Sequence, residues 1–163
     1  MKKTDELSLE KTLQFAAKCY SAHTTNSGEN LFSHAKNVAK YAEKIAGRLY
    51  QDMRADYVPE DSRDSIAAIL HCGVLHDVLN VSACAFEHVA EITNVQIAAM
   101  VAAISRDFRL VETKRDMEFR GRLSQSPVGA QIVVTADIIC TAQSLSLAVD
   151  TVGAGVIPKT KKI

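Results

Sequence analysis

Apolar residues recur every three or four positions along most of this chain, the spacing that places them on one face of an α-helix. The seven glycines and three prolines fall mostly between the segments with this spacing, as expected where helices end. The pattern therefore predicts an all-α protein. The expected helices span residues 9–22, 32–49, 62–79, 83–90 and 94–106, followed by a charged surface helix or lid over 111–124 and a long apolar helix after Ser126-Pro127.

Polar side chains interrupt two of the most apolar helices. Segment 62–79 is apolar almost all round, which indicates a helix buried in the middle of the fold, yet it contains His71, His76 and Asp77. The last long helix contains Asp137. Burial of an isolated carboxylate costs several kcal/mol unless a partner compensates it, so Asp77 and Asp137 each need such a partner.

Two histidines on neighbouring apolar segments, His34 and His76, supply that partner in one of two ways. One divalent cation held by both histidines and both aspartates would compensate all four groups at once. Two separate buried His–Asp pairs, each joined by a hydrogen bond, would do so without a metal. The spacing of the four residues along the chain leaves both alternatives open.

Helix geometry separates these candidates from two of their neighbours. His71 lies five residues before His76 and six before Asp77, so it points away from both and is expected to be a core histidine. Cys72 lies one turn before His76 and shares its face, but we interpret it as a small buried hydrophobe rather than a ligand.

Length and charge narrow the class of protein further. The 163 residues suffice for one core, so we expect a single domain over 1–152 and a flexible tail over 153–163. Basic and acidic residues both number 19, and this balance excludes a global basic field for nucleic acid or anionic lipid. With no C-x-x-C motif, no secretory signal and no run approaching the roughly 18 apolar residues of a membrane span, we expect a cytoplasmic protein with reduced cysteines.

Four stretches of the chain carry a resemblance to a known family. They are the small-residue helix and Ser-Gly-Glu-Asn turn of 16–34, the Val-Leu-His-Asp-Val helix within 67–78, the helix of 95–105 and the approach to Asp137 over 126–137. Together, over about 15–145, they resemble the HD superfamily of metal-dependent phosphohydrolases, and most closely the (p)ppGpp hydrolase domains of the RelA/SpoT type. The resemblance implies a single HD-domain helical bundle.

The resemblance also implies a metal and a class of substrate. The family's ligand positions fall on His34, His76, Asp77 and Asp137, which would hold one divalent ion. Nitrogen and oxygen ligands with open positions suit Mn²⁺ and would also accept Fe²⁺, Zn²⁺ or Mg²⁺. The expected partner is a small phosphoester, such as a nucleotide, and the sequence leaves a homo-oligomer open.

Five positions depart from the family's pattern. The Glu-Asp pair that assists the attacking water is replaced by Asn80 and Val81. Thr25 replaces a basic residue of the family, and Val134 replaces a lysine. Thr141 replaces the family's asparagine, one turn after the last aspartate. The metal ligands are thus retained while the machinery for guanosine polyphosphates is largely absent, and ppGpp hydrolysis is expected to be slow.

The general base is therefore not obvious from the sequence. Asp77 is the first candidate, and Asn80, one turn from His76, would orient water or a phosphate. Glu87 and His88 on the next short helix are further candidates, although a solvated helix face is the favoured explanation of both.

Substrate contacts are predicted at Lys114, Arg115 and Thr141. The two cations would grip phosphate from the charged segment 111–124, and Thr141 lies one turn beyond Asp137. The competing interpretation is a non-catalytic module that binds a metal or nucleotide, which the loss of the Glu-Asp pair favours. Retention of all four ligands favours the enzyme.

Overall fold

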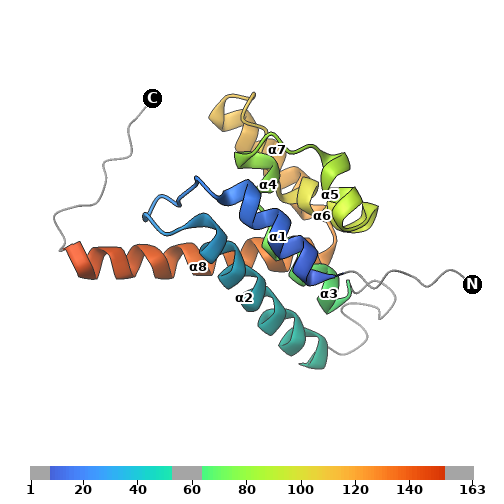
Figure 1. Cartoon of the computed structure of the whole chain (residues 1–163), viewed down its shortest axis with the longest axis horizontal. Coiled ribbons are helices and arrows are strands. Elements are labelled where there is room, and N and C mark those ends of the chain that lie inside the picture. The colour runs from blue at the N-terminus through green and yellow to red at the C-terminus, as the bar shows by residue number, and fades with distance from the viewer. Residues whose placement is uncertain (1–7, 53–63, 153–163) are drawn as a thin grey trace, which may run out of the picture.

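The computed structural model describes residues 8–52 and 64–152, and over these residues the chain forms eight helices and no strand (Figure 1). The all-α prediction is confirmed. The helices are α1 (Leu9–Tyr20), α2 (Leu31–Asp52), α3 (Ile66–Leu75), α4 (Val78–Val81), α5 (Phe86–Ile92), α6 (Val95–Ile104), α7 (Glu112–Ser124) and α8 (Val128–Val152). The predicted tail over 153–163 lies outside the described residues.

Polar side chains mark where several helices begin. The Ser65 hydroxyl accepts a hydrogen bond from the Ala68 amide at the start of α3, and the Asn94 side chain accepts one from Ile97 at the start of α6. Asn30 does the same for the first turn of α2, through the Ser33 amide. Each cap satisfies a backbone N–H that has no partner within its helix, which fixes the starting residue.

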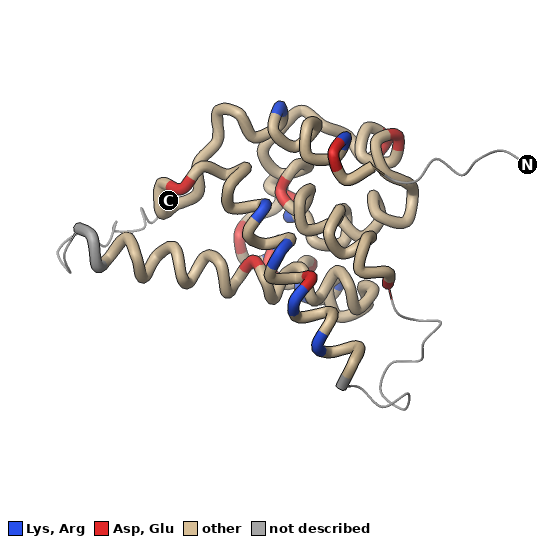
Figure 2. Tube along the Cα trace, turned by 60° about the horizontal axis from the view of Figure 1, so that its bottom comes forward, with Lys and Arg blue, Asp and Glu red and all other residues tan. Residues whose placement is uncertain are grey.

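Helix α3 is the centre of the bundle and packs against α1, α2, α6 and α8. Its neighbour α2 turns a row of small buried residues inward, while its lysines and arginine follow the outer side (Figure 2). The closest approach is at Gly73 of α3, where a Cβ atom would lie 2.7 Å from the Cα atom of Ala39 in α2. Small residues at this crossing therefore set how near the two helices lie.

Asp64 fixes the position of α8. Its buried carboxylate accepts a 2.8 Å hydrogen bond from the amide of Gly129, in the first turn of α8. A Cβ atom on Gly129 would lie 2.7 Å from Asp64 Oδ2, so glycine is needed for this contact. A carboxylate at a helix N-terminus also offsets the positive end of the helix dipole. This contact holds α8 against the residues that precede α3.

The predicted helix over 62–79 is interrupted in its second half. The structure ends α3 at Leu75 and begins α4 at Val78, and Asp77 between them has φ −106° and ψ −1°. The Asp77 amide donates to the hydroxyl of Tyr20 rather than to a helix carbonyl. Because Tyr20 is 57 residues away in sequence, local periodicity could not predict this break.

Helix α8 bears on the expectation that no apolar run spans a membrane. An 18-residue segment within Val128–Val149 has a mean hydropathy of 1.8, and by length and composition it could cross a membrane. Polar residues are spaced along it, so the sequence shows no unbroken apolar run. Only 22% of the segment is buried. Its first half packs in the bundle, its second half extends beyond the other helices (Figure 1), and it carries Asp137.

The crossing of α2 and α3 predicts the effect of one methyl group. Gly73→Ala would press its Cβ against backbone of Ala39, which cannot rotate away, so overpacking should cost about 1–3 kcal/mol. For a domain of this size the melting temperature should fall by about 3–10 °C. Thermal unfolding followed by circular dichroism measures the change.

Gly47→Ala in α2 is the matched control. A Cβ on Gly47 would meet nothing within 4 Å, and alanine is a better helix former than glycine by about 1 kcal/mol. Its melting temperature should stay equal or rise. Equal losses in the two variants would contradict the tight crossing at Gly73.

Candidate metal centre

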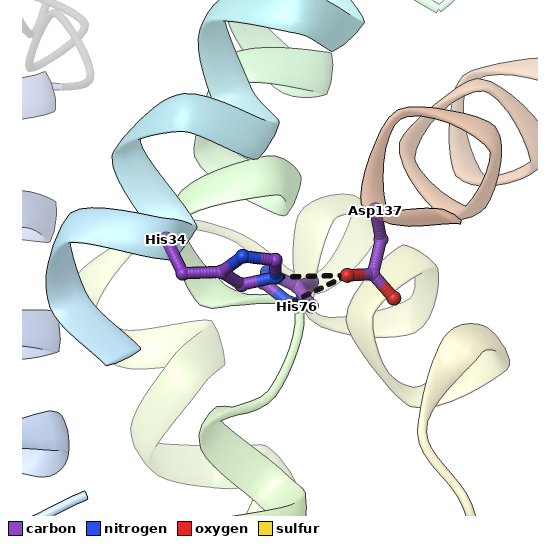
Figure 3. A group of neighbouring side chains, drawn as sticks. All are labelled: His34, His76 and Asp137. Carbon is purple, nitrogen blue, oxygen red and sulfur yellow. Dashed lines mark hydrogen bonds and ion pairs between the residues drawn. The ribbon is translucent and has the colours of Figure 1, made fainter. Parts of the chain in front are cut away.

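Three segments of the bundle direct polar side chains toward one point in its interior. His34 comes from the first turn of α2, His76 follows α3, and Asp137 comes from α8 (Figure 3). His34 Nε2 lies 2.9 Å and His76 Nε2 lies 3.8 Å from the same oxygen, Asp137 Oδ1. One candidate ligand atom from each residue lies within 4.8 Å of the others. The residues therefore form one cluster and not two separate His–Asp pairs.

Asp77 lies at the edge of this cluster. Its Oδ2 atom is 3.5 Å from His76 Nε2. Its Oδ1 atom accepts a 2.8 Å hydrogen bond from Asn80 Nδ2, and Asn80 Oδ1 in turn accepts one from the Arg106 amide. Both polar ends of Asn80 are thus engaged, and the side chain holds the Asp77 carboxylate in place.

The protonation of His76 provides a test of whether a metal fits. His76 Nδ1 donates a 2.9 Å hydrogen bond to the carbonyl of Gly73, which can only accept, so in the neutral ring the lone pair lies on Nε2. Nε2 is buried and has no hydrogen-bond partner among the described residues. An imidazole held through one nitrogen with the other unpaired matches a histidine ligand to a metal ion. The donor set fits a divalent ion.

The charges of the cluster shift two pKa values in opposite directions. Burial lowers the pKa of His34, but the hydrogen bond and charge of Asp137, with the charges of Glu29 and Asp77, outweigh it and raise the pKa above its ordinary value. Burial raises the pKa of Asp137, but the hydrogen bond with His34, the charges of His76 and His34 and the Thr141 hydroxyl lower it overall. In the metal-free protein, therefore, a proton on His34 and the ionised Asp137 stabilise each other.

Glu29 is a site residue that the sequence did not single out. Its Oε2 atom lies 3.6 Å from His34 Nδ1 and accepts a 2.6 Å hydrogen bond from Ser144 of α8. Its Oε1 atom accepts from Asn37 of α2. A carboxylate on the second nitrogen of a ligand histidine fixes the ring's orientation and tautomer. The only hint in sequence was its place in the Ser-Gly-Glu-Asn turn before His34.

Tyr20 is a second residue that the sequence missed. Its hydroxyl donates to the Val74 carbonyl at 3.2 Å and accepts from the Asp77 amide at 3.3 Å. Burial, and then the charge of Asp77, raise the pKa of Tyr20, so the hydroxyl keeps the proton that it donates. Tyr20 thereby holds the backbone where α3 breaks and directs Asp77 toward the cluster.

The other site residues predicted from the sequence lie at different distances from the cluster. Thr141 donates to Asp137 Oδ1 at 3.3 Å and borders the site. Arg115 stacks over the Phe108 ring at 4.9 Å, and Lys114 is exposed on α7. Glu87 and His88 are exposed on α5 and outside the cluster.

Two interpretations from helix geometry agree with the structure. His71 is buried, and its Nδ1 lies 2.8 Å from the Thr12 hydroxyl, so it is a hydrogen-bonded core histidine. Cys72 is fully buried, and burial raises the pKa of its thiol strongly. It is therefore a neutral core residue and not a thiolate ligand.

Two cavities open on either side of the cluster. One, of about 290 Å³, has mainly apolar and aromatic walls from α6, α7, α8 and the segment between α6 and α7. The other, of about 270 Å³, is lined largely by hydroxyl and amide side chains from the turn before α2 and from α8. Asp77, Val81 and Asp137 border both cavities. The cluster is thus accessible to a small molecule from two sides.

Comparison with known proteins identifies a solved structure with a similar fold. No protein-family model matches the chain, and no curated protein matches its sequence. Among solved structures, a metazoan ortholog of SpoT that hydrolyzes ppGpp and plays a role in starvation responses matches with a TM-score of 0.67. The identity is 18%, over 85% of this chain and 70% of that chain. The two chains share one fold, so the predicted likeness to (p)ppGpp hydrolase domains is confirmed for the fold.

Removal of one carboxylate charge tests the cluster. Asp137→Asn keeps the shape of the side chain but removes the charge that both histidines face, so Mn²⁺ binding should weaken by at least about tenfold. Metal titration by calorimetry gives the affinity. Asp107→Asn is the control, because Asp107 pairs with Arg109 away from the cluster. Undiminished binding by Asp137→Asn would show that the ion binds elsewhere.

The pKa shifts predict how pH affects the site. The raised pKa of His34 contributes stability that is fully present below about 6.5 and is lost as pH rises through the folded-state value. The lowered pKa of Asp137 contributes stability present above about 3.8 and lost as pH falls through its folded-state value. The His34–Asp137 pair therefore stabilises the metal-free protein most between about pH 3.8 and 6.5.

Metal binding should depend on pH in the opposite direction near the pKa of His34. A histidine ligand must be neutral, so Mn²⁺ affinity should rise with pH through the raised pKa of His34, and binding should release protons. Calorimetry between about pH 5.5 and 8, in buffers of different ionisation enthalpy, measures both quantities. An affinity that stays constant over this range would exclude His34 as a ligand.

Proposed function

We propose that this chain is a metal-dependent phosphohydrolase that acts on a small phosphoester, such as a nucleotide, in the cytoplasm. The observation that supports it most is the cluster in which the imidazole nitrogens of two buried histidines face one oxygen of the half-exposed Asp137, bordered by two cavities of small-molecule size. The ppGpp hydrolysis of the protein that shares this fold supports the same class of reaction.

Four residues would hold the ion in this proposal: His34, His76, Asp77 and Asp137. Two imidazoles and two carboxylates suit Mn²⁺ first, with Fe²⁺, Zn²⁺ or Mg²⁺ as alternatives. When bound, a divalent ion makes water a stronger acid and offsets negative charge on a phosphoryl oxygen.

The chain's own residues divide the remaining work. Asn80 positions Asp77, because its amide occupies Asp77 Oδ1. The oxygen Asp77 Oδ2 remains to face the ion or to accept a proton from the attacking water. Thr141 and the other hydroxyl groups of the smaller cavity would contact the substrate, and Thr141 would give up its hydrogen bond to Asp137 in order to donate to it. Lys114 and Arg115 would act from α7, where Arg115 lies over the Phe108 ring.

A non-catalytic module that binds metal or nucleotide is the second candidate. The engaged state of Asn80 favours it, since this side chain offers no base where the (p)ppGpp hydrolase domains have a carboxylate. An enzyme in this chain must therefore rely on Asp77. A purely structural role would not require the unpaired Nε2 atom of His76.

Activity with added metal distinguishes the two candidates. The full chain, stripped with a chelator and reloaded with Mn²⁺, should release phosphate or alcohol from at least one phosphoester in a panel of nucleotides and simple esters. Asp77→Asn should lower kcat by about 10²–10⁴-fold, the range of general-base assistance. Glu43→Gln, at an exposed position of α2 that lines neither cavity, should leave kcat unchanged. Metal-loaded protein without turnover on any ester would support the binding module.

A further inference from the structure

The two cavities described above differ in chemistry and meet at the metal-ligand cluster. The apolar lobe is the side formed by Ile104, Phe108, Phe119, Val133, Val134 and Ile138. The hydroxyl lobe is the side formed by Thr24, Thr25, Ser27, Thr141 and Ser144. Asp77, Val81 and Asp137 border both, so one bound molecule can contact both lobes while it contacts the cluster.

Positive charge is scarce in both lobes. No lysine or arginine lines the hydroxyl lobe, and Arg106 is the one cation that lines the apolar lobe within the described residues. Arg106 Nη1 is 2.6 Å from Asp116 Oδ1, and the guanidinium stacks 4.3 Å from the Phe119 ring centroid. It is therefore already neutralised. The basic residues of α2 follow its outer side and line neither lobe (Figure 2).

This charge distribution limits how many phosphates a substrate can carry. A divalent ion would balance the carboxylates of Asp77 and Asp137, and the carboxylate of Glu29 beside His34 would leave the site with no excess positive charge. One phosphoryl group could lie against the ion and the surrounding N–H and O–H donors. A second or third phosphate would lie in a lobe without a free cation, and charge that loses water without a partner is costly to bind.

The apolar lobe indicates the chemistry of the substrate beyond its phosphoryl group. Phe108 and Ile138, both in its wall, are 60% and 62% exposed. The lobe has a volume of about 290 Å³, and a cavity of about 150 Å³ holds a benzene ring. A flat apolar group of one or two rings therefore fits and would cover these side chains.

We propose that the substrate is an ester with a single phosphoryl group, bound at the cluster, on an alcohol whose flat apolar group occupies the apolar lobe. This inference rests on the proposed phosphohydrolase function and makes it specific. The hydrolysis adds water across the P–O bond, so that inorganic phosphate and the ring-bearing alcohol leave.

The number of phosphates is tested with the guanosine base held constant. GMP, GDP and ppGpp are compared as substrates of the Mn²⁺-loaded chain, and kcat/KM should fall at least about tenfold from GMP to ppGpp, the scale of one missing charged contact. Thr24→Lys places a cation at the hydroxyl lobe and should reduce this ratio about tenfold. Thr135→Lys adds the same charge on exposed α8 surface outside both lobes and should leave the ratio unchanged.

The apolar group is tested by binding without turnover. Phenylphosphonate, whose P–C bond is not hydrolysed, should bind the Mn²⁺-loaded chain at least about tenfold more tightly than methylphosphonate, because the ring loses its contact with water. Phe108→Ala should abolish this difference. Val111→Ala, at a 64% exposed position outside the lobes, should preserve it.

The outcomes separate this inference from the proposed function. Hydrolysis of ppGpp as efficient as that of GMP would overturn the inference and leave the phosphohydrolase intact. If no ester turns over, the phosphohydrolase fails, and a phenyl preference that depends on Phe108 would still support the single-phosphate ligand for a binding module. If Phe108→Ala leaves the phenyl preference unchanged, the apolar lobe is not the ring site and the inference is wrong.

Discussion

The interior of this bundle holds two imidazole rings against one carboxylate, and the rest of the architecture has to accommodate that contact. Each of these groups loses water on burial, at a cost that is recovered only when partners lie at short distances. The partners come from α2, from α8 and from the break after α3. His34 and Asp137 are 103 positions apart in the sequence. The helices must therefore approach closely. The Gly73–Ala39 crossing and the Asp64–Gly129 hydrogen bond allow that approach.

Neutral and charged polar groups around the cluster hold His34, His76 and Asp77 each in one orientation. Glu29 lies at the far nitrogen of His34, the Gly73 carbonyl holds His76, and Asn80 holds Asp77. The lone pair of His76 Nε2 is thus kept in a buried position where none of the described residues donates a hydrogen bond to it. This preorganisation reduces the rearrangement needed when an ion binds, because the ligand side chains already have the orientation in which they would hold it.

Sequence reasoning found the parts of the site that depend on local patterns and missed those that depend on distant contacts. The place of Asp77 and Asp137 in apolar stretches of sequence pointed to partners, and the 100° turn per residue separated His71 from His76. The break after Leu75 was missed because it depends on Tyr20. Glu29 was missed because its main contact, Ser144, is 115 residues away. No periodicity in either segment reports such a pair.

The central claim is that His34, His76, Asp77 and Asp137 hold one divalent ion. Anomalous X-ray scattering at the manganese edge, from crystals of the full chain grown with Mn²⁺, tests it most directly. The account predicts a single strong peak between the two imidazole Nε2 atoms and the two carboxylates, with the Gly73 contact of His76 retained. An empty cluster, in crystals whose manganese peak lies elsewhere or is absent, would contradict it.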